Sequence, residues 1–157
     1  TCLWANSLIF CKRRLERAYW ATLLSMNERL RGQVRQRAHD RCEYCHMPQS
    51  GTVLPHEADH VRSQKHGGPS TLENLCWACA WCNSFKGSDI AAYSPGSDRI
   101  VPLFSPRSDA WDDHFVWEGA IIRGKTPVGS ATVELLRFNR AERVDHRRLL
   151  MELRLWE

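Results

Sequence analysis

The sequence predicts an α+β fold in which a small ββα unit lies between an N-terminal helix and a C-terminal hairpin followed by helices. Three observations lead to this prediction. Apolar residues recur every four positions within residues 27–39, at Leu30, Val34 and Ala38, which is typical of a helix. Two Cys-x2-Cys motifs enclose a strand-like stretch and a glycine-rich loop. Residues 114–123 alternate between apolar and polar side chains, which indicates two short strands.

The chain has the length of one ordinary domain with a core of its own. It contains 157 residues and carries a formal net charge of +4, which permits a polyanionic partner without demonstrating one. We expect three parts: an atypical extension over residues 1–25, a compact unit with its leading basic helix over residues 26–90, and a loop, hairpin and helical cover over residues 91–157. Met26 is a candidate natural start, in which case the extension is translated upstream sequence.

The seven cysteines indicate a metal site rather than a disulfide framework, because their number is odd and two pairs have metal-binding spacing. Cys42 with Cys45, and Cys79 with Cys82, predict a structural zinc ion with four thiolate ligands. The alternative is that these thiols are free and pack as small apolar side chains. Cys76 complicates the assignment, since Cys76 and Cys79 have the same spacing. Such cysteine usage indicates a reducing compartment, and we expect a cytoplasmic protein.

The stretch between the cysteine pairs carries most of the polar residues of interest. Residues 53–61 have strand character, residues 65–69 reverse the chain, and residues 70–73 fit a capping box for a single helical turn. The second cysteine pair then opens a helix. Along this path lie the candidates for chemistry: Glu57, Asp59, His60, Asn74, Asn83 and Lys86.

In their order these motifs resemble the zinc-bearing members of the HNH endonuclease family, which read C-x2-C, D-H, N-L and C-x2-C-N-x2-K. The likeness covers residues 37–88 and continues more weakly into the C-terminal part. It implies a ββα-metal core and an endonuclease that cuts DNA. It also implies that His60 is the general base, that Asp59 and Asn83 bind a catalytic divalent metal ion, and that Asn74 orients the base or braces its loop.

Phosphodiester hydrolysis needs residues of these types. A neutral imidazole, with an unperturbed pKa of about 6.5, can take a proton from water near neutral pH. Asn83 replaces a histidine of other family members, and its amide oxygen suits Mg²⁺ or Mn²⁺ better than a nitrogen-preferring metal. We therefore expect Zn²⁺ as the structural ion, Mg²⁺ or Mn²⁺ as the catalytic ion, and DNA as the partner, without a membrane or a small-molecule substrate. Because no sequence-reading motif is visible, we expect weakly specific cleavage.

Arginine dominates two segments, residues 28–41 and residues 137–154, and its planar guanidinium suits phosphate oxygens. The cations that we expect at DNA phosphates are Arg35, Arg37, Arg62 and Lys86. Solvated helix faces explain such cations about equally well. For Trp77 and Trp81 we favour packing beside the zinc site over stacking on nucleic-acid bases.

Three other functions fit parts of the sequence. Residues 56–60 spell His-Glu-x-x-His, the zinc metalloprotease signature, but Pro55 before it and the turn over residues 67–69 oppose the helix that this motif needs. The zinc deaminase signature is incomplete, because His-x-Glu is absent and no proline precedes Cys79. A non-catalytic zinc module that binds DNA or protein stays open, and it predicts that His60→Ala changes neither activity nor binding.

The C-terminal part is expected to cover the ββα unit. Residues 91–113 are rich in Pro, Ser, Gly and Asp and predict an ordered loop. Ser130 can cap a helix that runs to Phe138. No apolar run is long enough to span a bilayer. A last helix over residues 141–156 has apolar positions suited to burial: Val144, Leu149, Leu150, Leu153 and Trp156.

Overall fold

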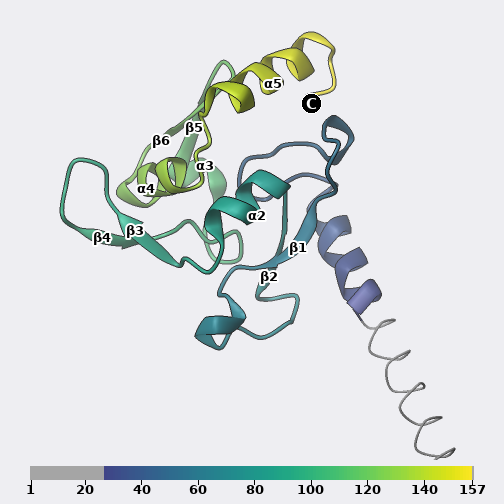
Figure 1. The fold of residues 1–157 in the computed structure, drawn as a ribbon, viewed down its shortest axis with the longest axis vertical. Coiled ribbons are helices and arrows are strands. Elements are labelled where there is room, and N and C mark those ends of the chain that lie inside the picture. Colours follow the sequence, from purple (N-terminus) through teal and green to yellow (C-terminus); the bar gives the residue numbers. More distant parts are fainter. Residues whose placement is uncertain (1–26, 157) are drawn as a thin grey trace, which may run out of the picture.

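The computed structural model describes residues 27–156, so the predicted extension over residues 1–25 and Met26 lie outside the described part. Three two-stranded antiparallel sheets alternate with short helices, which confirms the predicted α+β class (Figure 1). A helix covers residues 27–37. The elements that follow are η1 (Gln49–Gly51), β1 (Glu57–His60), η2 (Gln64–His66), β2 (Leu75–Ala78), α2 (Ala80–Lys86), β3 (Ala91–Tyr93), β4 (Ile100–Pro102), α3 (Trp111–His114), β5 (Phe115–Glu118), β6 (Ile121–Gly124), α4 (Pro127–Leu135) and α5 (Ala141–Glu152).

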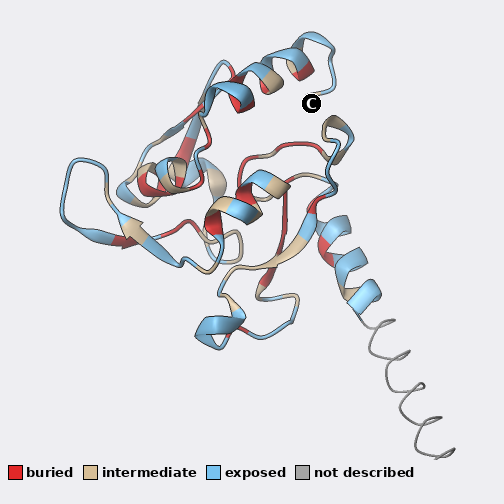
Figure 2. Cartoon of the chain, in the orientation of Figure 1, coloured by how far each residue is buried: buried red, intermediate tan, exposed pale blue. Residues whose placement is uncertain are grey.

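The strands β1 and β2 pair in antiparallel fashion and α2 packs on both, which gives the predicted ββα unit. In this pair Asp59 lies opposite Cys76, and His60 lies opposite Leu75. The strand β2 is buried along its whole length (Figure 2). The N-cap of α2 is Cys79, whose sulfur accepts a hydrogen bond from the main-chain N–H of Cys82 at 3.5 Å. The second cysteine pair therefore starts the helix and fixes its position against the sheet.

The helix over residues 27–37 packs on β2 through a small apolar cluster. Val34 is fully buried against Leu75 and Trp77. On the same helix, the guanidinium of Arg31 lies over the Trp77 ring, 4.9 Å from its centroid. The four-residue spacing of apolar side chains therefore identified both this helix and its buried face.

The main core joins the ββα unit to the C-terminal part of the chain. Both cysteine pairs belong to the same buried cluster as apolar side chains from β5, β6, α5 and the segments beside them. The Phe104 and Phe115 rings meet edge to face within it, with centroids 5.0 Å apart. Other members of this cluster are Met47, Ile122, Leu136, Phe138 and Leu150. Residues 91–156 thus cover the cysteine pairs directly.

Two predicted loop features differ in the structure. The residues expected to form a capping box make a hydrogen-bonded turn instead, in which the N–H groups of Asn74 and Leu75 both donate to the carbonyl of Thr71, each at 3.0 Å. The expected loop over residues 91–113 contains the β3–β4 hairpin, which projects from the body in Figure 1, and the start of α3. Three-residue strands carry too short an alternation to be recognised by their pattern.

The β5–β6 hairpin is confirmed, with a turn at Gly119, whose φ is 59°. The prediction for α4 was wrong at its start, because Thr126 rather than Ser130 is the N-cap. The Thr126 hydroxyl accepts a hydrogen bond from the N–H of Gly129 at 3.0 Å. Pro127 occupies the first helical position, which favours the earlier start because its ring fixes φ near the helical value.

The buried face of α5 also differs from the prediction. Leu149 and Leu153 are exposed. Two arginines, which were expected either on a solvated face or at phosphates, are buried, and one of them, Arg147, donates to two main-chain carbonyl groups at 2.6 and 2.9 Å. Neither α5 nor any other helix of the described part is long and apolar enough to cross a membrane. The buried residues of α5 are Arg143, Val144, Arg147 and Leu150.

Candidate functional site

Four buried cysteine sulfurs converge at the junction of the ββα unit and the C-terminal part. The sulfurs of Cys42, Cys45, Cys79 and Cys82 all lie within 4.8 Å of one another, and those of Cys45 and Cys79 are 3.7 Å apart. Ligand sulfurs at about 2.3 Å from a tetrahedral zinc ion are about 3.8 Å from one another, so this spacing fits zinc. Burial raises the pKa of the Cys42 and Cys82 thiols well above the ordinary value. A cation is therefore needed if all four sulfurs are to be thiolates.

Cys76 does not compete for this position. Its side chain is fully buried within β2, and the metal-ligand group found among residues 27–156 contains only the other four cysteines. Burial raises the pKa of Cys76 to about 12, so the thiol is neutral. The ambiguity of its spacing to Cys79 is thereby removed.

Arg143 of α5 lies against the cysteine cluster, a contact that the sequence did not reveal. Its Nη2 donates to the Cys82 sulfur at 3.2 Å, and its Nη1 donates to the carbonyl of Leu136 at 2.7 Å. Burial disfavours the charged guanidinium, but the nearby sulfurs of Cys82, Cys45 and Cys79 outweigh this effect and raise the pKa of Arg143. Arg143 thus supplies a positive charge to the sulfur cluster from a distant part of the chain.

Acidic and amide side chains meet along the seam between β1 and α2. Asn83 Nδ2 donates to the Glu57 carboxylate at 3.2 Å, and Lys86 Nζ lies 3.1 Å from Asp59 Oδ2. Glu57 and Asp59 are two residues apart, so they point to the same face of the strand. Asn83 and Lys86 are three residues apart, so they share one face of the helix. The predicted metal ligands Asp59 and Asn83 therefore line one seam, together with Glu57.

Asp59 lies at the buried end of this seam. Its Oδ2 is buried and forms an ion pair with Lys86. Burial raises the pKa of the Asp59 carboxyl, although the Lys86 ammonium opposes the rise. The Asn83 side-chain nitrogen donates to Glu57, and the side-chain oxygen Oδ1 accepts no hydrogen bond from the residues described. Asp59 and Asn83 thus offer oxygen atoms of the kind that Mg²⁺ and Mn²⁺ prefer.

His60, the next residue on β1, is held by the loop that follows. Its Nε2 lies 2.9 Å from the Ser70 hydroxyl oxygen, which also accepts a hydrogen bond from Gln64 Nε2 at 3.2 Å. If the imidazole proton is on Nε2, the ring donates to Ser70 and its Nδ1 keeps a lone pair. Ser70 was considered in the sequence only as a helix cap, so its contact with His60 was missed.

Asn74 braces the loop between β1 and β2. Its Oδ1 accepts from the N–H of Arg62 at 3.0 Å, and its Nδ2 donates to the carbonyls of Arg62 and Pro69, each at 2.9 Å. Gly68 packs so closely here that a Cβ would overlap the carbonyl of Arg62. Asn74 therefore fixes the loop that carries Ser70 and has no hydrogen bond to the His60 ring among the contacts described.

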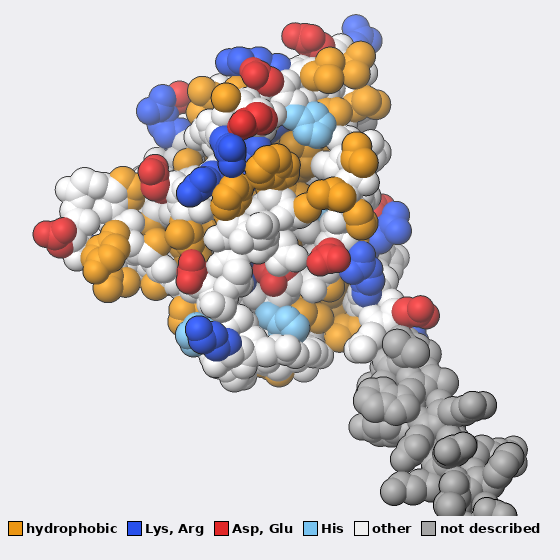
Figure 3. All heavy atoms as spheres, viewed as in Figure 1, with side chains coloured by type: hydrophobic (Ala, Val, Ile, Leu, Met, Phe, Trp, Pro, Cys, Tyr) orange, Lys and Arg blue, Asp and Glu red, His pale blue; other side chains and the backbone are white. Residues whose placement is uncertain are grey.

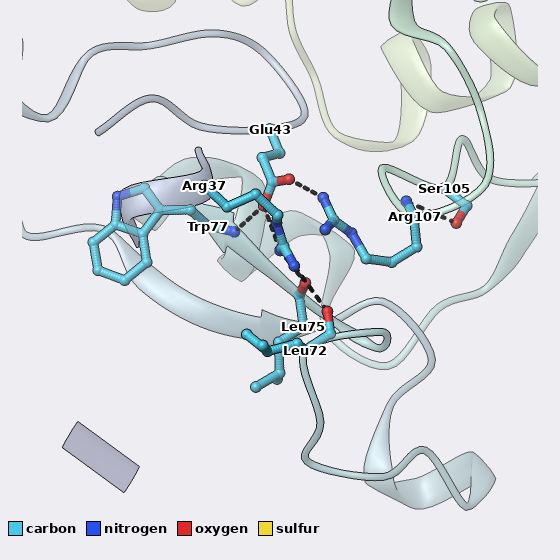
Figure 4. A network of polar contacts seen from close by, with 7 residues as sticks. All are labelled: Arg37, Glu43, Leu72, Leu75, Trp77, Ser105 and Arg107. Carbon is cyan, nitrogen blue, oxygen red and sulfur yellow. Dashed lines mark hydrogen bonds and ion pairs between the residues drawn. The ribbon is translucent and has the colours of Figure 1, made fainter. Parts of the chain in front are cut away.

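Two of the cations expected at DNA phosphates, the buried Lys86 and the exposed Arg37, donate to groups within the protein. Lys86 is 2% exposed, and its Nζ donates to the main-chain carbonyl of His60 at 2.7 Å. Arg37 donates to the carbonyls of Leu72 and Leu75 at 2.8 and 2.6 Å (Figure 4). Their side chains hold β1, β2 and the loop together. The Lys86 ammonium is buried and is not free to contact a phosphate, whereas the Arg37 side chain is 33% exposed.

Glu43 is the acceptor at the centre of the network in Figure 4. Its carboxylate accepts from Arg37 Nη2 at 3.2 Å, from the main-chain N–H of Trp77 at 2.7 Å, and from Arg107. Burial, reinforced by repulsion from Arg37, lowers the pKa of Arg107 to about 10. One carboxylate between the first two cysteines thus joins three segments of the chain.

The other two predicted cations lie on the surface. Arg35 is exposed and forms an ion pair with Asp40. Arg62 is exposed beside the His60 loop, where its Nη2 donates to the carbonyl of Gly67 at 3.3 Å. Exposed pairs of this kind contribute little stability, so both guanidinium groups can exchange partners.

The structure excludes the geometry of a His-Glu-x-x-His metalloprotease. Residues 57–60 form a strand, and a separation of four residues in extended chain is about 13 Å. The ring of His56 is buried, with Nε2 2.9 Å from the carbonyl oxygen of Met47. His56 and His60 therefore cannot bind one zinc ion as they would on a helix.

Comparison with known proteins identifies the same segment. The family model of the HNH endonuclease matches residues 42–89, from the first cysteine of the cluster to just beyond Lys86. Comparisons with curated proteins and with solved structures gave no match. The resemblance inferred from the motifs is therefore confirmed over this segment, which forms an HNH domain. Such a domain indicates a nuclease-type or nucleic-acid-binding function.

Proposed function

We propose that this protein is a metal-dependent endonuclease that hydrolyses phosphodiester bonds in DNA, with His60 as the general base. The observation that carries the proposal is the seam between β1 and α2. There Asp59 and Glu57 face the helix that bears Asn83, and His60 is adjacent on the strand. This seam lies inside the segment that matches the HNH endonuclease family.

The donors of the seam suit a divalent cation with oxygen ligands. Asp59 and Asn83 would hold Mg²⁺ or Mn²⁺. The Glu57 carboxylate, which accepts a hydrogen bond from Asn83, would be a further oxygen acceptor beside them. A bound ion would stabilise the negative charge that develops on the phosphoryl and leaving oxygens. The four cysteines would hold Zn²⁺, which fixes the start of α2 and therefore the position of Asn83.

His60 supplies the base. With its proton on Nε2, donated to Ser70, the ring would keep Nδ1 able to take a proton from a water molecule. The water oxygen then forms a bond to phosphorus while the bond from phosphorus to the 3′ oxygen breaks, and the leaving oxygen takes a proton from solvent. A positioned base of this kind accelerates a reaction by about 10²–10⁴-fold. The exposed Arg35 and Arg62 are proposed as phosphate contacts, which orient DNA without reading its sequence.

Cleavage of supercoiled plasmid by the purified protein tests this function. We expect nicked or linear products with Mg²⁺ or Mn²⁺, no products with EDTA, and a rate about 10²–10⁴-fold lower for His60→Ala. His66→Ala is the matched control, because His66 lies on the exposed η2 turn and makes no side-chain hydrogen bond among those described. This control should cut at the wild-type rate.

Binding of a fluorescent DNA duplex should be measured beside cleavage. His60→Ala is expected to bind as tightly as the wild type, since the base is not a phosphate ligand. Equal cleavage rates for His60→Ala and the wild type would refute the mechanism. Binding without cleavage by the wild type in both metals would identify a nucleic-acid-binding module instead.

A further inference from the structure

The two tryptophans beside the cysteine cluster occupy opposite environments. Trp77 is 2% exposed and packs under the helix over residues 27–37. Trp81 on α2 is 39% exposed. Its ring stacks on that of Phe85, one turn further along the helix, with centroids 5.9 Å apart and an interplanar angle of 23°. Packing thus explains Trp77, whereas Trp81 keeps a large part of its surface in solvent.

Two arginines lie over this aromatic pair. The guanidinium of Arg137 is 4.9 Å from the Phe85 ring centroid, and that of Arg140 is 5.7 Å from the Trp81 ring centroid. Both come from the segment between α4 and α5 and are exposed. Figure 3 shows hydrophobic and basic side chains adjoining over α2 and this segment. We call Trp81, Phe85, Arg137 and Arg140 the aromatic–arginine face.

The arginines are positioned by the backbone that carries them. Arg137 has a positive φ of 49°, and its main chain is held by hydrogen bonds around the end of α4, including one from the Phe138 N–H to the carbonyl of Val133 at 3.0 Å. Arg140 pairs with Glu142 at 3.0 Å, and both side chains are exposed. An exposed pair contributes little, so Arg140 can turn to a phosphate at small cost.

The aromatic–arginine face and the seam lie on different sides of the same short helix. Trp81 and Phe85, four residues apart, share one side of α2, whereas Asn83 and Lys86 face β1. Because α2 is only about 10 Å long and a helix is about 10–12 Å across, a nucleic-acid strand with a phosphate at Asn83 that continues around α2 would reach Trp81 within a few nucleotides. The combination of stacked aromatic rings with cations is the one that binds unpaired bases and their phosphates. In a duplex the base faces are already stacked and cannot reach the rings.

We propose that the aromatic–arginine face binds single-stranded DNA that continues around α2 from the seam, so that the preferred substrate has unpaired bases within a few nucleotides of the cleaved phosphate. Only the substrate preference rests on the proposed endonuclease function; the binding of single-stranded DNA does not. An exposed ring stacks on a base, and Arg137 and Arg140 neutralise the phosphates on either side of it. The charge of the face complements a polyanion, which favours nucleic acid over a protein partner.

The test is DNA binding by a protein that cannot cut, His60→Ala, measured by fluorescence anisotropy with labelled oligothymidine and with a duplex of equal length. We expect tighter binding to oligothymidine. Adding Trp81→Ala should weaken that binding by roughly 5- to 150-fold and leave duplex binding nearly unchanged. Trp81→Phe should restore most of the affinity. The control is Tyr93→Ala, because Tyr93 is an aromatic residue 64% exposed on β3, away from α2.

Arg137→Ala with Arg140→Ala gives a second readout, because both substituted positions lie outside the cysteine-bearing helix. The slope of log affinity against log salt should decrease by about 1.4 for oligothymidine, as expected for two lost phosphate contacts on a single strand. Zinc content of each variant shows whether the cluster has stayed intact. If the Trp81 variants lose zinc, the salt dependence of oligothymidine binding by the arginine double variant decides whether the face binds DNA.

Four outcomes separate this inference from the proposed function. Equal affinity for single strands and duplex, or wild-type binding by both sets of variants, would overturn the inference even if plasmid cleavage is observed. A face that binds a protein partner but not oligothymidine would overturn it as well. Tight binding of oligothymidine through Trp81 by a wild-type protein that never cuts would uphold the face and refute the endonuclease. Preferential cutting beside unpaired bases, lost in Trp81→Ala, would support both.

Discussion

Replacing Arg143 with leucine is expected to destabilise the fold and the cysteine cluster together. Arg143 is 1% exposed and donates to the Leu136 carbonyl at 2.7 Å and to the Cys82 sulfur at 3.2 Å. Leucine fills part of the same space but donates no hydrogen bond. The substitution would therefore leave a buried carbonyl without its donor and a buried thiolate without its counter-charge.

The magnitude follows from these two losses. A hydrogen bond to a charged group contributes about 1.5–3 kcal/mol, and removing one member of a buried charge pair costs about 3–5 kcal/mol. The apolar contacts of the leucine offset part of this cost, so we expect the free energy of unfolding to fall by about 3–4 kcal/mol. With a urea dependence of about 2 kcal/mol per molar, the midpoint would fall by about 1.5–2 M.

Urea denaturation followed by tryptophan fluorescence measures the midpoint, and a colorimetric chelator measures the rate of zinc release. Arg148→Leu is the matched control, because Arg148 lies on the same helix, is exposed, and pairs at 2.9 Å with the exposed Asp145. This control should stay within about 0.5 kcal/mol of the wild type. Equal midpoints and equal zinc release for the two variants would refute the role assigned to Arg143.

Three further predictions concern the loop and the zinc site. Gly68→Ala should destabilise by about 1–3 kcal/mol, because its Cβ would overlap the carbonyl of Arg62, whereas Gly67→Ala meets open space and should cost about 1–2 kcal/mol for its φ of 72°. Thermal denaturation compares them, and a Gly68→Ala protein as stable as the wild type would contradict the loop geometry. Ser70→Ala should lower kcat about tenfold, the worth of one hydrogen bond to His60, without weakening DNA binding, and Ser70→Thr should restore it. An unchanged kcat would remove Ser70 from base positioning. Chelation of zinc should abolish the circular dichroism of the folded protein, because structural zinc supplies about 10–16 kcal/mol in small folding units. An unchanged spectrum after complete removal would show that the thiols pack without an ion.

The features predictable from the sequence were those encoded over short distances. The four cysteines were found because each pair has a spacing typical of metal-binding turns, and the sulfurs do converge. The helix over residues 27–37 was found because its apolar residues repeat at the helical period. The β5–β6 hairpin was found because its strands alternate and are joined by a turn at Gly119.

The contacts that arginine and lysine side chains make within the protein could not be predicted, because most of their partners are distant in the sequence. Arg147 and Arg37 donate mainly to main-chain carbonyls. Every residue has such a carbonyl, so the sequence does not indicate which one accepts a hydrogen bond. Arg143 donates to the Cys82 sulfur, and this partner is 61 positions away in the sequence. Lys86 was expected either to contact a DNA phosphate or to be a solvated helix lysine, yet its ammonium is buried and contacts the Asp59 carboxylate and the carbonyl of His60.

Within the seam, the sequence indicated the residue types but not their contacts. Asp59 and His60 were singled out by the family motif, and the strand places them beside α2 as the ββα unit requires. The partnership of Glu57 with Asn83 depends on the angle between strand and helix, which no spacing rule contains. Ser70 reaches His60 only because Asn74 bends the intervening loop back toward β1.

The three contacts of Glu43 bear on the order in which the chain can fold as it is synthesised. The carboxylate lies between the first two cysteines, but its donors Trp77 and Arg107 are 34 and 64 positions away. Contacts between such distant residues close late, because a long loop must be ordered first. In a nascent chain that ends before Arg107, the Glu43 carboxylate in the Cys42–Cys45 turn would therefore lack one of its hydrogen-bond donors. Ribosomal pausing or truncation in that interval would expose an unfinished metal-binding turn rather than a smaller stable domain.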